Sequence, residues 1–107
     1  MLELTPQQLE VLGRFRDARF ALRSFPLYAS YVAVVSGNCA VLLAPVPGGG
    51  MRIYGEPCSL VADNMAVRVN RDGREWFVWK KQQVEATPAR LEELRQFVEN
   101  VNEVLGG

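Results

Sequence analysis

Histidine is absent from this chain of 107 residues, and only two cysteines are present. Because histidine is the usual general base at neutral pH and the commonest metal ligand, its absence excludes a Ser–His or Cys–His catalytic pair. Two thiols are too few for a four-cysteine zinc site or a disulfide scaffold. Carboxylates at the spacing of metal ligands are also lacking. We therefore predict that the protein is not an enzyme and uses no metal or other cofactor.

An excess of charge is lacking too, since 12 Lys and Arg residues balance 12 Asp and Glu residues. Neutrality disfavours bulk attraction to nucleic acid or to an anionic membrane. The N-terminus has no basic stretch followed by an apolar run, and the most apolar segment, 31–46, is interrupted at 36–38. A membrane span needs about 20 apolar residues, so none is predicted. We expect a cytoplasmic protein in which Cys39 and Cys58 are reduced, although a disulfide between them stays open.

What is present is the composition of a globular domain, with 49% hydrophobic residues. A chain of about 100 residues usually forms one domain and buries roughly two-thirds of its unfolded surface. We predict a single α+β domain over residues 1–107.

Two segments begin with the signals of a helix. Thr5-Pro6 followed by Gln8 predicts a capping box with proline in the first turn, and the helix is expected to reach Arg23. Thr87-Pro88 repeats the signal and predicts a helix that ends at the terminal Gly106-Gly107. In both segments apolar residues recur every three or four positions, which predicts one buried stripe on each helix.

Between these helices, segments rich in β-branched and aromatic residues predict strands. The link at 56–64 reads as a helical turn, a strand extension or an irregular segment, and we leave these alternatives open. The expected order is helix, three antiparallel strands, irregular link, two-strand hairpin and helix, with both helices packed on one face of an antiparallel sheet. The strands are predicted at 28–35, 39–44, 51–55, 65–70 and 74–84.

This order of elements resembles the type III secretion chaperone class, which also runs helix, three strands, linking helix, two strands and helix. The final hairpin and helix are also similar to the end of pleckstrin-homology-like domains. The resemblance implies a chaperone- or adaptor-like role in protein binding. It rests on element order and not on a residue motif, so no site residue is carried over.

The hairpin at 65–84 can pair in two registers. A two-residue loop would place Arg71 opposite Arg74, where like charges repel, so we predict a three-residue loop. That register puts Trp76 on the outer face of the sheet between Arg68 and Lys80. Because Trp and Arg are enriched at binding hot spots, these three residues are a candidate protein-binding patch. The alternatives are a solvated face with an Arg68–Trp76 cation–π contact, or a Trp76 covered by another element.

A second candidate surface lies on the first predicted helix, where Leu9, Gly13 and Phe20 share a face away from the core stripe. Glycine inside a helix costs about 1 kcal/mol relative to alanine and often marks the close approach of another backbone. This face could form a homodimer, or it could pack against the last helix.

We thus expect a non-catalytic protein-interaction domain that binds a protein partner or itself, as a homodimer. One alternative is a small-ligand carrier with a cavity lined by Tyr28, Tyr31, Tyr54 and Trp79. Another is binding of single-stranded nucleic acid, since basic residues exceed acidic ones within 68–81 and lie near aromatic ones.

Two further features are assigned no chemistry. Glu56 and Asp63 could form an acid–base pair, but two carboxylates in a polar link are more often solvated. The glycine-rich loop at 47–50 runs into a predicted strand and lacks the Lys-Ser/Thr of a phosphate-binding loop.

Overall fold

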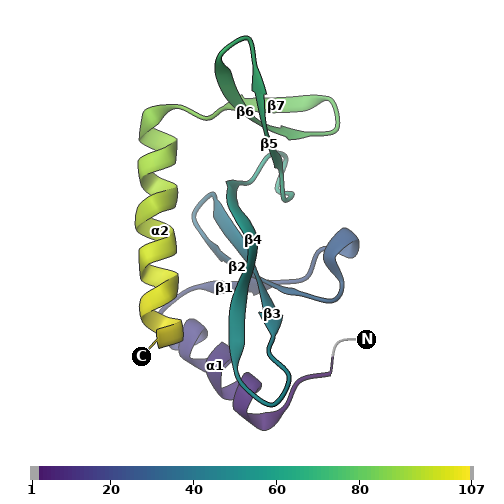
Figure 1. Ribbon diagram of the computed structural model, residues 1–107, viewed down its shortest axis with the longest axis vertical. Coiled ribbons are helices and arrows are strands. Elements are labelled where there is room, and N and C mark those ends of the chain that lie inside the picture. The colour runs from purple at the N-terminus through teal and green to yellow at the C-terminus, as the bar shows by residue number, and fades with distance from the viewer. Residues whose placement is uncertain (1–2, 107) are drawn as a thin grey trace.

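The computed structural model describes residues 3–106, which form an α+β fold with two antiparallel sheets and two helices (Figure 1). The four-stranded sheet has the order β1-β2-β3-β4, and the three-stranded sheet has the order β5-β6-β7. The expected single sheet is therefore wrong, and no linking helix separates the two groups of strands in the described chain. The elements are α1 (Pro6–Asp17), β1 (Ala21–Arg23), the 3-10 helix η1 (Pro26–Tyr28), β2 (Val32–Ser36), β3 (Cys39–Pro45), β4 (Met51–Ser59), β5 (Val67–Arg71), β6 (Arg74–Trp79), β7 (Gln82–Glu85) and α2 (Pro88–Gly106).

Helix α1 begins as predicted but ends six residues early, at Asp17 instead of Arg23. At its start, the Thr5 hydroxyl accepts from the Gln8 amide at 3.2 Å, and the Gln8 side chain accepts from the Thr5 amide at 2.9 Å. At its end, Arg19 takes a left-handed conformation, and the Phe20 amide donates to the Phe15 carbonyl at 3.0 Å. This is a Schellman motif, which usually has glycine at the left-handed position. Because arginine stands there instead of glycine, no residue signals that the helix ends at this point.

The core of the four-stranded sheet is β3, which is buried along its length up to the half-buried Pro45. Both helices contact this sheet and each other. Strand β4 is longer than predicted because Gly55-Glu56-Pro57 bulge opposite Val41 alone, after which pairing resumes at Cys58. Gly55 has a φ of 74°, which suits glycine. Both Gly and Pro are tolerated at a bulge on an edge strand, so they do not end it.

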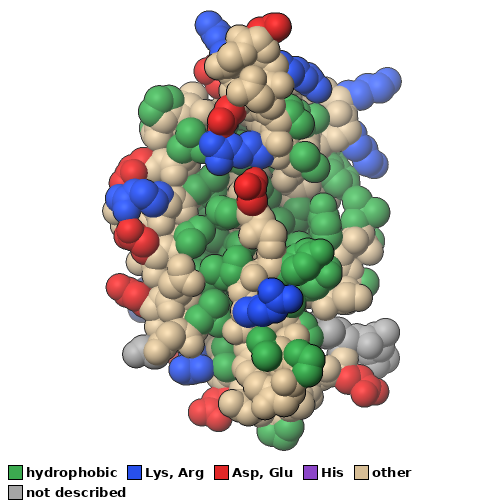
Figure 2. All heavy atoms as spheres, in the orientation of Figure 1, with side chains coloured by type: hydrophobic (Ala, Val, Ile, Leu, Met, Phe, Trp, Pro, Cys, Tyr) green, Lys and Arg blue, Asp and Glu red, His purple; other side chains and the backbone are tan. Residues whose placement is uncertain are grey.

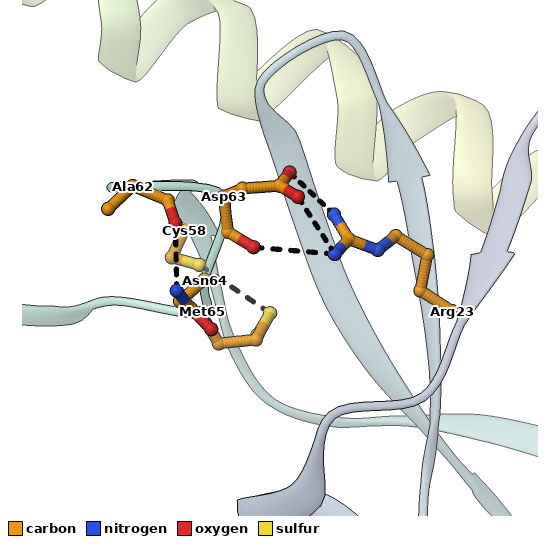
Figure 3. Close-up of polar contacts among 6 residues, drawn as sticks. All are labelled: Arg23, Cys58, Ala62, Asp63, Asn64 and Met65. Atoms are coloured by element: carbon orange, nitrogen blue, oxygen red, sulfur yellow. Dashed lines mark hydrogen bonds and ion pairs between the residues drawn. The ribbon is translucent and has the colours of Figure 1, made fainter.

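The link at 56–64 is partly a strand extension and partly a tight turn. After Ser59 the chain turns at Val61–Asn64, which form an isolated bridge around Ala62 and Asp63. Arg23 holds this turn from β1, with its Nη1 donating to Asp63 Oδ1 at 2.7 Å and its Nη2 to Oδ2 at 3.1 Å (Figure 3). The turn therefore lies against the face of the four-stranded sheet that carries Arg23.

The last expected hairpin is a three-stranded meander in a different register. Arg71 pairs with Arg74, so the β5–β6 loop has two residues, Asp72 and Gly73, both with positive φ. Asp-Gly is a favoured pair for this tight turn, and this preference outweighs the repulsion between two exposed arginines that can point into water. A second tight turn at Lys80-Lys81 divides the predicted strand 74–84 into β6 and β7. It carries no Gly, Pro or Asn that would have signalled it.

Helix α2 confirms the prediction from Thr87-Pro88, and the Thr87 hydroxyl accepts from the Arg90 amide at 3.2 Å. Its buried side chains are Leu94, Phe97 and Val101. The molecule extends 46 Å along its longest axis. The three-stranded sheet lies at the end of this axis where α2 begins (Figure 1). Across residues 3–106, no helix has the length and apolar character that crossing a bilayer requires.

Candidate interaction surface

The outer face of the three-stranded sheet carries four apolar side chains that the core does not use. Paired residues point to the same face of a sheet, and the pairs Val67–Val78 and Val69–Trp76 follow each other along β5 and β6. Within residues 3–106, none of the four is buried or packs against the core. Val67 is 58% exposed, and the other three are half-buried. We call Val67, Val69, Trp76 and Val78 the outer patch.

The opposite face of the same sheet points inward. Phe77 lies between Trp76 and Val78 in sequence, faces the other way, and is fully buried. Arg68 pairs with Phe77 and shares its face, where its Nε donates to Glu75 Oε2 at 2.6 Å. The one-residue difference in register therefore moves Arg68 away from Trp76, as expected when the side-chain period is two.

The predicted trio of Trp76, Arg68 and Lys80 is thus not brought together. Trp76 does lie on the outer face, but Arg68 lies on the inner one. Lys80 sits in the β6–β7 turn with a φ of 53°, and its Nζ lies 5.3 Å from the ring centroid of Trp79. The expected Arg68–Trp76 cation–π contact is absent from the described residues, where Arg68 is paired with Glu75.

Two other arginines take the place of Arg68 beside Trp76. Arg71 and Arg74 pair with each other. Arg71 follows Val69 by two residues, and Arg74 precedes Trp76 by two residues, so both arginines lie on the outer face. Arg71 Nη1 donates to Gln83 Oε1 at 2.9 Å. Gln83 belongs to β7, so this bond spans β6 and brings the Arg71 guanidinium over the outer face. The Asp-Gly dipeptide after Arg71 was the signal that could have placed this pair.

The end of the molecule with the outer patch is locally basic although the chain is neutral. Lys80 and Lys81 at the second turn add to Arg71 and Arg74 at the first, while Asp72 is the acidic residue between those arginines in sequence. Figure 2 shows several Lys and Arg side chains gathered over this end. The outer patch therefore has the Arg71–Arg74 pair at one end, whereas Lys80 lies over Trp79, which faces the core.

The three residues expected to share a face of the first helix do not do so, because Phe20 lies beyond the end of α1. Its ring packs edge-on against Phe15 at 5.4 Å and lies 6.0 Å from the ring of Phe97. Leu9 remains 56% exposed on α1, and Gly13 is half-buried with open space where a Cβ would stand. Phe20 thus packs against the core and does not project from the helix toward a partner.

The four aromatic residues expected around a ligand cavity do not enclose one. Tyr28 and Trp79 line a crevice of only about 20 Å³ with Met65, far below the roughly 300 Å³ of a small-molecule pocket. Tyr31 and Tyr54 stack at 4.3 Å, and Tyr54 is 42% exposed. A larger hollow of about 580 Å³, between the β2–β3 turn and α2, is lined by none of these four residues.

The two cysteines are free, buried and inert in this arrangement. Cys39 pairs with Ser59 and Cys58 with Ala40, so the two thiols point to opposite faces of the sheet. Burial, with a smaller contribution from the Glu93 charge, raises the pKa of Cys39 to about 11. Burial also raises the pKa of Cys58. A thiol with a raised pKa holds little nucleophilic thiolate at neutral pH.

Glu56 and Asp63 do not meet as an acid–base pair. Asp63 is bound by Arg23, whose hydrogen bond and positive charge lower the pKa of the Asp63 carboxyl. Glu56 lines a separate hollow with Arg68 and Asn70. In residues 3–106 no three potential metal ligands cluster.

Comparison of the chain with models of protein families, with curated proteins and with solved structures finds no match to any of them.

Proposed function

We propose that this chain is a non-catalytic protein-interaction domain, chaperone- or adaptor-like, that binds a partner protein through the outer patch. The observation that carries this proposal is the position of Trp76 and three valines on a sheet face that, within residues 3–106, does not pack against the core. An antiparallel sheet facing water normally alternates apolar residues inside with polar residues outside. Here β5 and β6 are apolar on the side away from the core, which is typical of an interaction site.

The composition of the surface supports a protein partner. Trp76 lies at the centre of the patch, on the central strand, and Arg71 reaches over the same face. Trp and Arg are the residues that most often contribute hot spots, each costing about 2 kcal/mol or more of binding free energy when truncated. A nucleic acid would use the cations and one stacking base, but it would leave the three valines without a partner.

The occupant we propose is an extended segment of another protein. A standard interface buries roughly 800 Å² on each partner, more than these side chains can supply by themselves. Two copies meeting through this face with their β5–β6 turns at the same end would also bring two Arg71–Arg74 pairs together. Homodimerisation stays a prediction of its own, which light scattering at two protein concentrations about tenfold apart would test.

A cytoplasmic location belongs to this proposal. It is supported by the two free thiols, since cysteines in secreted proteins are usually bonded.

Selection of random peptides displayed on phage against the immobilised protein tests the proposal. We expect enriched peptides that bind the wild-type protein and lose binding to Trp76→Ala. Tyr54→Ala is the matched control, because it removes an exposed aromatic side chain from the other sheet. If no peptide is enriched, or if the enriched peptides bind Trp76→Ala as well as wild type, the outer patch is not the binding surface.

A further inference from the structure

Arg71 and Arg74 form an unusual pair, because like charges directly opposite each other destabilise two strands. Both side chains are exposed and both belong to the outer face. Asp72, the residue next to Arg71, forms no ion pair with either arginine in the described chain. Two guanidinium groups on one face offer several N–H donors, and a carboxylate is the group that such donors bind most strongly.

Three arginines of the described chain have carboxylate partners, and the others, Arg71 and Arg74 among them, form no ion pair in residues 3–106. Arg23 binds Asp63, Arg68 binds Glu75, and Arg95 binds Glu92 and Glu99. In residues 3–106, by contrast, Arg71 is bonded to the neutral Gln83, and neither Arg71 nor Arg74 forms an ion pair. Neither arginine is therefore neutralised by an ion pair in the described chain, and Glu85, which pairs with Trp76 from β7, is the carboxylate nearest to them on this face in the strand register.

The outer face presents three rungs along the strands: Arg71–Arg74, then Val69–Trp76, then Val67–Val78. Successive rungs are two residues apart, which is about 7 Å along a strand. An extended segment also places every second side chain on one face at this spacing. A matching segment would therefore carry an acidic residue, then an apolar one two positions along, then another apolar one two positions further.

We propose that the outer patch binds an extended partner segment of this acidic–x–apolar–x–apolar pattern, with its carboxylate between Arg71 and Arg74. This inference rests on the proposed function and adds the chemistry of the partner. The carboxylate removes the repulsion between the two arginines, so the sequence of charges on the partner decides its affinity and its direction along the strands.

Two synthetic peptides test the inference: Glu-Thr-Val-Thr-Val and its charge-reversed partner Lys-Thr-Val-Thr-Val, both with blocked ends. Nuclear magnetic resonance titration of the isotope-labelled protein reports both affinity and location. We expect the Glu peptide to shift resonances of β5 and β6 and to bind about tenfold more tightly than the Lys peptide, as for one charge-assisted contact.

Variants locate the preference. The double variant Arg71→Gln/Arg74→Gln should bind the Glu peptide about tenfold more weakly and lose the discrimination between the peptides. Lys81→Gln, which removes a charge from the other turn, is the control and should bind as wild type does. Replacing both arginines by glutamate should reverse the preference toward the Lys peptide, an outcome that loss of folding cannot mimic.

The outcomes separate this inference from the proposed function. If the two peptides bind equally and Trp76→Ala abolishes the binding of both, the outer patch remains the binding surface and the acidic preference is overturned. Binding that Trp76→Ala leaves unchanged would overturn both. No shift with either peptide at millimolar concentration would overturn the pattern proposed here, while the phage selection still decides the surface. Tighter binding of oligothymidylate, falling steeply with salt, would replace the protein partner by nucleic acid.

Discussion

Arg71 and Arg74 face each other across the β5–β6 turn, on the same side of the sheet as Trp76. Because this contact is repulsive in the free protein, replacing Arg74 by Gln should raise the free energy of unfolding by about 0.2–1 kcal/mol. The gain should shrink at high salt, which screens exposed charges. Urea denaturation at low and high ionic strength measures both effects. Lys81→Gln is the control and should change neither; an unchanged or lower stability for Arg74→Gln would show that the arginines do not repel.

Neighbouring residues of β6 should respond very differently to truncation, because they point to opposite faces. Phe77 is fully buried, so Phe77→Ala should cost about 3–5 kcal/mol of unfolding free energy. Trp76 lies outside the core, and Trp76→Ala should cost no more than about 1 kcal/mol, the scale of a cross-strand pair. Thermal and urea denaturation of the two variants compares them directly. A loss of about 3 kcal/mol or more for Trp76→Ala would make it a core residue and remove the outer patch.

The pairing register of β5 and β6 explains how much of the outer patch could be predicted from the sequence. The strand pattern correctly set Trp76 and Val78 on one face and Phe77 on the other, since alternation along one strand needs no knowledge of its partner. Which residues of β5 share the face of Trp76 depends on the length of the β5–β6 loop. Because the loop is one residue shorter than predicted, Val69 and Arg71 lie on that face in place of Arg68. Repulsion between two exposed charges is weak compared with the strong preference of Asp-Gly for a two-residue turn.

The remaining differences between the predicted and observed elements arise at residues whose type does not predict their backbone conformation. Arg19, Lys80 and Ala62 all have positive φ, a conformation that sequence reasoning assigns first to Gly or Asn. Arg19 ends α1 and so removes Phe20 from the predicted helix face. By contrast, the starts of both helices carried explicit Thr-Pro capping signals, and both were confirmed.

The ion pair between Arg23 and Asp63 should make stability depend on acid pH. Hydrogen bonding and the charge of Arg23 lower the pKa of Asp63 below its ordinary value of 3.8. A carboxyl with a lowered folded pKa contributes stability that is present above its unfolded pKa and is lost as the pH falls through the folded value. Asp63→Asn should therefore flatten the acid side of the stability–pH profile below about pH 4. Asp17→Asn, at an exposed carboxylate of α1, is the control; identical profiles for Asp63→Asn and wild type would contradict the prediction.

The turn that this ion pair holds contains a second testable strain, at Ala62. Ala62 and Asp63 have φ values of 49° and 62°, a conformation that is costly for residues with a Cβ. Glycine adopts it freely but loses more conformational entropy on folding, so Ala62→Gly should raise the free energy of unfolding by a net of about 0.5–1 kcal/mol. Ala89→Gly, at an exposed position in the first turn of α2, is the matched control and should lower it. Urea denaturation of both variants gives opposite signs if Ala62 is strained, whereas a destabilised Ala62→Gly would show that the left-handed turn is not maintained in solution. The gain from Ala62→Gly should persist in an Asp63→Asn background, which removes the ion pair with Arg23, since asparagine also tolerates the left-handed conformation.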